Sequence, residues 1–159
     1  MLHVHLIVVG KLKETYWREA EVEYLKRLSA FVRVTIHELK EESFSDKDKP
    51  EIIKEHEAKK ITIEIKKISD SFIIVLDEHG KQFSSINFAK QLNVVTVQQH
   101  NTITLVVGGP LGLHESIRQR AHLNLSLSLL TFTHQMARII LLEQLYRAMM
   151  IAHSRRYHY

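Results

Sequence analysis

Apolar residues along this chain fall either into short continuous runs or at helical spacing, which predicts strands separated by helices. Residues 2–9 are uncharged, rich in β-branched side chains and ended by Gly10, so we predict a strand there. From Lys13 to Leu28 the apolar positions recur at the spacing of an amphipathic helix. Residues 31–37 alternate with period two, as a half-buried strand does.

The middle of the chain is dominated by charged residues. Residues 38–49 are polar and charged, which predicts a solvated loop. Asp48 and Pro50 match a helix N-cap followed by a first-turn proline, so we predict a helix that runs to about Lys67. Glu and Lys make up much of this helix, and most of its surface should therefore face water.

The second half of the chain repeats the alternation of strands and helices. Its predicted elements are a strand over 71–76, a turn over 77–83, a helix begun by Ser84 or Ser85, a strand over 102–107, a short helix over 114–121, an alternating strand over 123–129, and a long helix from Thr131 or Thr133 to about His153. The runs 71–76 and 102–107 are apolar throughout, which is typical of strands covered on both faces.

This order of elements indicates an α/β domain with a mostly parallel sheet. No internal repeat, low-complexity segment or linker divides the chain, so we expect residues 1–159 to form one domain. In sheets of this class ligands bind beyond the carboxyl ends of the strands. Three such ends have unusual sequence, namely residues 76–78, 108–110 and 127–132.

Two of these strand ends have compositions that suit a ligand. Gly108 and Gly109 would let a ligand approach the backbone, although a tight strand-to-helix turn has the same composition. Neither a dinucleotide-binding glycine pattern nor a phosphate loop is present. Residues 127–132 mix hydroxyls with leucines, which suits a slot for a small molecule, but a strand end followed by a threonine cap explains them as well.

The net charge of +4 is unevenly placed. Residues 1–75 hold 14 basic and 14 acidic side chains, whereas residues 76–159 hold 8 and 4. From Ser116 onward the chain has six arginines, no lysine and one acid, Glu143. Arginine presents a planar fork of donors that matches phosphate, so a polyanionic partner is expected.

The composition also excludes several kinds of site. The chain has no cysteine, which rules out disulfides, thiolate metal sites and a cysteine nucleophile. His3 and His5 share one face of the first predicted strand without a third ligand, so we expect no metal site. Apolar runs fall short of the ~18 residues of a membrane span. The N-terminus is apolar before it is basic, the reverse of a secretory signal, so we expect a cytoplasmic protein.

The last predicted helix combines apolar residues with charges. Residues 139–142 are apolar on every side of one turn, which favours burial against a second subunit. Glu143 and Arg147 stand at i, i+4, the spacing of an intrahelical ion pair. Because charges beside so much apolar surface are costly, Arg138 and Arg147 are candidate functional residues.

The C-terminal tail mixes cations with rings. Arg155 and Arg156 are followed by Tyr157 and His158, a composition that suits RNA, where bases stack on rings and phosphates pair with arginine. We therefore predict Arg138, Arg155 and Arg156 as RNA-binding residues.

Several segments together resemble one family. They are LDEHGKQFSS (76–85), VVGGPLGL (106–113), LSLSLLTFTHQMARIILLEQLYRA (125–148) and the Tyr157-His158 pair, with the opening VVGKLKETYWREAEVEYLKRL similar as well. The chain resembles the RlmH (YbeA) family, the large-subunit ribosomal RNA methyltransferases of the SPOUT superfamily. The similarity runs from end to end.

The resemblance implies an α/β fold with a C-terminal trefoil knot, an obligate homodimer, and S-adenosylmethionine as methyl donor without a metal. Carried onto this sequence, the implied donor-contacting positions are Leu76, Gly108, Leu127, Ser128, Leu129, Leu130, Thr131 and Phe132. These positions coincide with the three strand ends identified above.

The implied acceptor is nitrogen N3 of a pseudouridine in helix 69 of the 23S rRNA, in the assembled ribosome. We expect Arg147 to stabilise the developing anionic base, and Tyr157 and His158 to position the nucleotide. His134 or His158 would accept the proton, since histidine serves as a base near neutral pH.

The sequence departs from the family pattern at a few positions and leaves two alternatives open. The departures are Ser154, Arg156 and Tyr159 in the tail, and Ile86 and Asn87 where the family commonly has acidic residues. A ribosome-binding factor without activity would keep the same basic face. A SPOUT methyltransferase that acts on tRNA would keep the same donor site.

Overall fold

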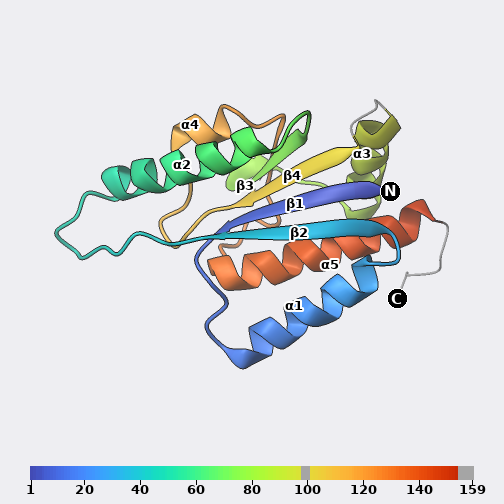
Figure 1. The fold of residues 1–159 in the computed structure, drawn as a ribbon, viewed down its shortest axis with the longest axis horizontal. Helices are drawn as coiled ribbons and strands as arrows, with labels where there is room; N and C mark the ends of the chain where they lie inside the picture. Colours follow the sequence, from blue (N-terminus) through green and yellow to red (C-terminus); the bar gives the residue numbers. More distant parts are fainter. Residues whose placement is uncertain (98–100, 154–159) are drawn as a thin grey trace.

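The computed structural model describes residues 1–97 and 101–153. Its elements are β1 (Leu2–Val9), α1 (Thr15–Leu28), β2 (Val32–Leu39), α2 (Pro50–Lys67), β3 (Phe72–Lys81), α3 (Ser85–Val97), β4 (Thr102–Val107), α4 (Glu115–Arg118), β5 (Leu123–Leu125) and α5 (His134–Ala152). The strands form a five-stranded sheet in the order β2-β1-β4-β3-β5, and every pairing in it is parallel (Figure 1). The predicted α/β architecture is confirmed.

Helices cover both faces of the sheet (Figure 1). On one face, α1, α3 and α5 pack against side chains such as Val4 and Leu6 of β1. On the other face, α2 and α4 pack against the alternate residues Ile7 and Val9. The sheet is therefore buried on both sides, which explains why its central strands are apolar throughout.

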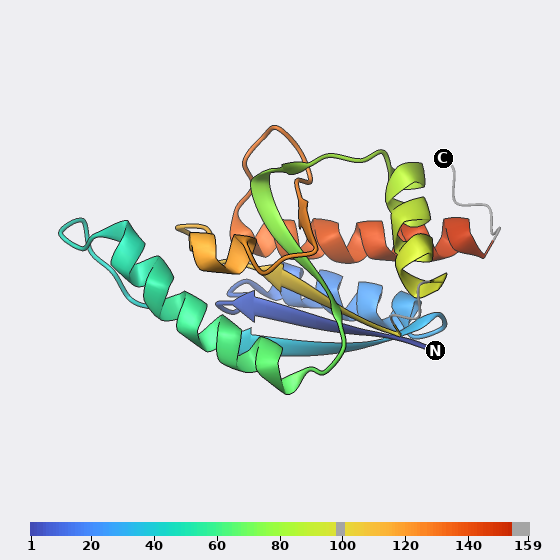
Figure 2. The same ribbon diagram turned by 90° about the horizontal axis from the view of Figure 1, so that it is seen from above.

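The last helix α5 lies across the first of these faces. Leu141, Leu142 and Leu145 are fully buried in the core formed with α1, α3 and the sheet. The apolar turn at 139–142 is thus largely covered within one chain, and it does not by itself require a second subunit. Figure 2 shows α4 and the loop of residues 126–133 toward the start of α5, and α3 toward its other end.

Three local predictions were wrong. The predicted turn at 77–83 is instead the end of β3, which extends to Lys81 because Lys81 pairs with Leu125 after an irregularity that follows Leu76. The strand predicted over 123–129 ends at Leu125, and side-chain hydrogen bonds hold the residues after it.

The third error concerns the start of α2, where Lys49 occupies the N-cap position. The carboxylate of Asp48 instead accepts hydrogen bonds from the backbone N and the hydroxyl of Ser45, at 2.7 and 2.9 Å. The Asp48 side chain therefore stabilises the loop before the helix instead of capping the helix.

Across residues 1–97 and 101–153, no helix combines the length and the apolar character needed to cross a membrane.

Candidate functional site

A cavity of about 800 Å³ lies beyond the carboxyl ends of β3 and β4, bordered by the 126–133 loop and the first turn of α5. This volume falls in the range of sites that hold small molecules and cofactors. Among the predicted donor positions, the residues that line it are Leu76, Gly108, Leu127, Ser128, Leu130, Thr131 and Phe132. Leu129 does not line the cavity, and the residue is 90% exposed.

The wall after β4 depends on glycine. A Cβ atom on Gly108 would lie 2.7 Å from Cγ of Leu113, which is closer than real contacts allow. Gly109 and Gly112 form an isolated bridge, in which the N–H of Gly112 donates to the carbonyl of Gly109 at 3.0 Å. The segment is both a tight turn and a cavity wall, so the two interpretations of its sequence are compatible.

The 126–133 loop is held by its own hydroxyl groups. The Ser126 hydroxyl donates to the carbonyl of Ser128 at 2.9 Å, and the Ser128 hydroxyl accepts from the N–H of Leu130 at 3.0 Å. The Thr131 hydroxyl donates to Glu78 at 3.3 Å, which links the loop to β3. Thr133 caps α5 by accepting from the N–H of Met136. Because the loop hydroxyls take part in these bonds, the loop presents mainly leucine side chains and backbone groups to the cavity.

His134, the first residue of α5, also lines the cavity. Its Nε2 is buried near Gly10, and it has no hydrogen-bond partner among the residues that the structure describes. Burial lowers the pKa of the imidazole, an effect that Glu41 opposes. A neutral imidazole with an unpaired nitrogen can accept a proton, as a general base must.

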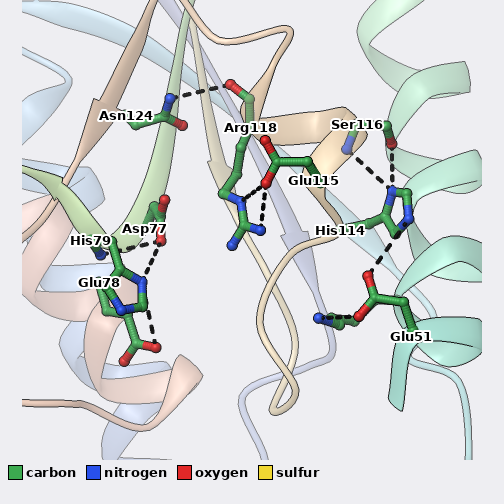
Figure 3. A network of polar contacts seen from close by, with 10 residues as sticks. Glu51, Asp77, Glu78, His79, His114, Glu115, Ser116, Arg118 and Asn124 are labelled. Atoms are coloured by element: carbon green, nitrogen blue, oxygen red, sulfur yellow. Dashed lines mark hydrogen bonds and ion pairs between the residues drawn. The ribbon is translucent and has the colours of Figure 1, made fainter. Parts of the chain in front are cut away.

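The cavity also has charged walls. Asp77 and Glu78 line it from β3, Lys54 from α2 and Arg118 from α4. Figure 3 shows the surrounding network, in which the carboxylate of Asp77 accepts a hydrogen bond from the backbone N of His79 at 3.2 Å.

Arg147 is not part of this cavity. Its Nε and Nη2 donate to one carboxylate oxygen of Glu143 at 3.1 and 2.6 Å, which confirms the predicted ion pair. Arg147 lies thirteen residues beyond His134 on α5, or about 20 Å along the axis at the rise of an α-helix. The two candidate catalytic residues of one chain are therefore far apart.

Arg138 has a different environment from the one predicted. Its Nε donates to Glu21 of α1 at 2.5 Å and its Nη1 to Glu38 of β2 at 2.9 Å, while only 4% of its side chain is exposed. Burial raises the pKa of Glu21, and the Arg138 charge opposes that rise. An RNA contact by Arg138 does not fit this placement, because the guanidinium is buried and would have to leave Glu21 and Glu38 to reach a phosphate. The other predicted RNA-binding and tail residues, Arg155, Arg156, Tyr157 and His158, lie outside the described residues.

A comparison with protein families matches residues 2–158 to the family described as "Predicted SPOUT methyltransferase". The chain belongs to the SPOUT methyltransferase family. Among its relatives, proteins named "Ribosomal RNA large subunit methyltransferase H" from Leuconostoc mesenteroides and Pelotomaculum thermopropionicum are 42% and 40% identical, over 99% and 100% of both chains. The protein of that name from Streptococcus equi is 43% identical over 99% of both chains.

Some residues around the cavity of this SPOUT family member gave no signal in the sequence. Lys54 stands in a helix crowded with Glu and Lys, so nothing distinguishes it from solvated neighbours. Glu57 is buried on the same helix against Gly109, and its carboxylate accepts from the N–H of Glu42 at 3.1 Å. Burial raises the pKa of Glu57. A buried glutamate on the inner face of an amphipathic helix is detectable only once the face is known.

His3 and His5 of β1 do not line the cavity. His5 Nδ1 is 2.9 Å from Nε2 of His37 on β2, and His37 Nδ1 is 2.9 Å from the Glu64 carboxylate on α2. These nitrogens bond to one another rather than converging on a point. Among the described residues, no group of three or more histidine or acidic side chains is arranged to hold a metal ion.

Proposed function

We propose that this SPOUT family member transfers a methyl group from S-adenosylmethionine to N3 of a pseudouridine in helix 69 of 23S rRNA, in the cytoplasm and on the assembled ribosome. The observation that carries the proposal is the cavity in which residues from three strand ends come together. The names of relatives that are 40–43% identical over nearly the whole chain support a substrate in large-subunit rRNA.

The cavity suits this donor in size and in chemistry. Its volume of about 800 Å³ is ample for a nucleoside with an amino-acid arm. Gly108 and the 126–133 loop offer backbone groups, and Leu127 and Leu130 offer apolar surface for the adenine ring. When bound, S-adenosylmethionine supplies a methyl group on a positively charged sulfur.

The residues of the chain would bind the acceptor and take up its proton. As the bond from N3 to the methyl carbon forms and the bond from that carbon to sulfur breaks, the N3 proton leaves to a base. His134 is one candidate because it lines the cavity and because burial lowers its pKa, which favours the neutral imidazole, with His158 as the other candidate. Arg147 would stabilise the negative charge that develops on the pseudouridine ring, while Tyr157 and His158 would position the nucleotide.

A homodimer would complete the site. Arg147 is about 20 Å along α5 from His134, too far for both to act on one nucleotide. Tyr157 stands five residues beyond the end of α5, so its backbone reaches at most about 18 Å back along a helix about 28 Å long. We therefore propose that Arg147 and the tail act beside the cavity of a second copy. The trefoil knot remains a prediction.

Ribosomes from a strain that lacks this protein provide the test. Purified protein with methyl-labelled donor should label them, and mass spectrometry of helix 69 should place one added methyl group on the pseudouridine. Labelling of tRNA instead would favour a tRNA methyltransferase. Ribosome binding without any transfer would favour a factor without activity.

A variant that ends at residue 153 tests whether the tail is needed for methyl transfer but not for donor binding. We expect this shortened chain to bind S-adenosylhomocysteine as the full chain does and to transfer no methyl group. Full transfer by the shortened chain would remove Tyr157 and His158 from the mechanism.

A further inference from the structure

Two cations line one wall of the cavity, and neither has a role in the function proposed above. Lys54 reaches this wall from α2 and Arg118 from α4. Only 18% of the Lys54 side chain and 31% of the Arg118 side chain are exposed, although lysine and arginine usually lie largely in water. The cavity therefore has a positive wall formed by two elements that cover the same face of the sheet.

The guanidinium of Arg118 has bonding capacity left over. Its Nε and Nη2 both donate to a single oxygen of Glu115, at 2.9 and 2.6 Å. Its Nη1 makes no hydrogen bond to any residue that the structure describes. Figure 3 shows this guanidinium projecting from α4 into the space between β3 and α2.

The present partners of both cations are easy to replace. Lys54 pairs with Glu51 at 2.7 Å and Arg118 with Glu115, each three residues away on the same helix. Both glutamates are exposed, so their carboxylates remain hydrated and the pairs are weak. An anion entering the cavity can take over the cations while the glutamates turn to solvent.

The charges of the cavity are also arranged by sign. Among the described residues that line it, the acids Asp77 and Glu78 both come from β3, whereas Lys54 and Arg118 come from the helices opposite. An amino-acid group carries one carboxylate and one ammonium, and it matches a cavity with one positive and one negative wall. The remaining lining residues are His134, Gln135 and residues that offer backbone, hydroxyl or apolar groups.

We propose that Lys54 and Arg118 form the subsite for the α-carboxylate of the donor's methionine arm. This inference rests on the proposed function, because it assigns one end of the same donor. An RNA phosphate is a poorer match, because Lys54 lies within the cavity and a duplex backbone follows the outer surface. The subsite selects donors that carry a free carboxylate.

The test compares two nucleosides by titration calorimetry on the full chain. S-adenosylhomocysteine carries the amino-acid arm, whereas 5′-methylthioadenosine has the same adenosine and sulfur without it. Wild type should bind S-adenosylhomocysteine at least about tenfold more tightly than it binds 5′-methylthioadenosine. Lys54→Met and Arg118→Met should each lower that affinity about tenfold, as expected for a lost hydrogen bond to a charged group, and change the affinity for 5′-methylthioadenosine less than about twofold.

Matched controls come from the same elements. Lys59 on α2 pairs with Glu55 as Lys54 pairs with Glu51, but it is 65% exposed and does not line the cavity. Arg120, just beyond α4, is also exposed and outside the cavity. Lys59→Met and Arg120→Met should bind both nucleosides as wild type does. Lys54→Arg and Arg118→Lys, which keep the charge, should retain most of the affinity and show that the folded cavity is intact.

The possible results separate this inference from the proposed function. If both methionine variants bind S-adenosylhomocysteine as wild type does, the subsite is wrong while the donor site stands. The subsite is equally wrong if the variants lose both nucleosides alike, or if they weaken only ribosome binding. If wild type binds neither nucleoside, the proposed function fails and the subsite fails with it.

Discussion

Arg138 of α5 and Glu21 of α1 form a buried ion pair, with Nε and Oε2 2.5 Å apart. Glu38 of β2 joins the same guanidinium, so one arginine connects the last helix to the first helix and to an edge strand. This triad, of which Arg138 and Glu21 are largely buried and Glu38 is more exposed, ties α5 to the sheet. The start of α5 lines the cavity, so the triad also fixes the position of His134.

The first prediction is that Arg138→Met destabilises the protein strongly. Removing the arginine leaves two carboxylates without their charge partner, and breaking a buried pair costs about 3–5 kcal/mol of unfolding free energy. Urea denaturation measures the loss. Lys59→Met, which removes an exposed pair, should cost less than about 1 kcal/mol. A stable Arg138→Met chain that has lost affinity for ribosomes would restore the prediction of an RNA contact.

The second prediction is that His5, on β1, makes the folded protein less stable in acid. Burial, and after it the charges of His3, His37 and Arg33, lowers the pKa of His5 to about 4, from an ordinary value of 6.5. Between these values the unfolded chain binds a proton that the folded chain does not, so stability falls as the pH drops from about 6.5 to about 4.

His5→Gln tests this effect, because glutamine keeps a hydrogen-bonding group toward His37 and does not titrate. Urea denaturation at several pH values should show a smaller loss of stability in the variant than in wild type over that interval. Identical slopes would show that His5 does not carry the effect.

The third prediction is that Arg147→Ala lowers turnover by about 10²-fold or more, since in the proposed mechanism it removes the cation that stabilises the developing negative charge. Donor binding should be unchanged, because Arg147 does not line the cavity. Single-turnover methylation of ribosomes and calorimetry with S-adenosylhomocysteine measure the two effects. Arg120→Ala, outside the cavity, should match wild type in both measurements.

Mixing two impaired chains tests whether Arg147 acts across a dimer. A chain with Arg147→Ala keeps its cavity, and a chain with Gly108→Ala keeps its arginine. If each site takes its cavity from one chain and its arginine from the other, refolding the two together should restore part of the activity. No recovery in a mixture shown to contain mixed dimers would place both residues in one chain.

The fourth prediction is that Gly108→Ala damages the cavity. The added methyl group would lie 2.7 Å from Leu113, a buried side chain with little room to move. Overpacking of this kind costs about 1–3 kcal/mol, and we expect the affinity for S-adenosylhomocysteine to fall at least about tenfold.

Shortening Leu113 to alanine in the same chain should recover part of that affinity, which a double-mutant cycle measures. Donor binding that is unchanged in Gly108→Ala would show that the wall after β4 is not part of the donor site.

Local pattern was sufficient to predict the elements that are buried on both faces. Residues 2–9 and 102–107 were predicted as strands with the bounds of β1 and β4, because their apolar runs are ended by glycine. Residues 77–83 were mispredicted because Asp and Gly favour turns, whereas β3 continues to Lys81, which pairs with Leu125.

Contacts between distant parts of the chain limited what could be predicted of the site. The pattern around Arg138 showed a charge among apolar residues, but its partners Glu21 and Glu38 belong to other elements. Lys54 and Arg118 meet at one cavity only because α2 and α4 cover the same face. By contrast, the donor positions followed from the family resemblance, and of these only Leu129 lies away from the cavity.

The strand order has a consequence for the nascent chain. β1 is made first, yet its inner neighbour is β4, and His3 pairs with Thr102. Until that residue emerges from the translating ribosome, one edge of β1 stays without its partner, a state prone to aggregation. Such long-range pairing slows folding. The cavity itself needs the 126–133 loop and the start of α5, so it cannot form until these segments have also been made.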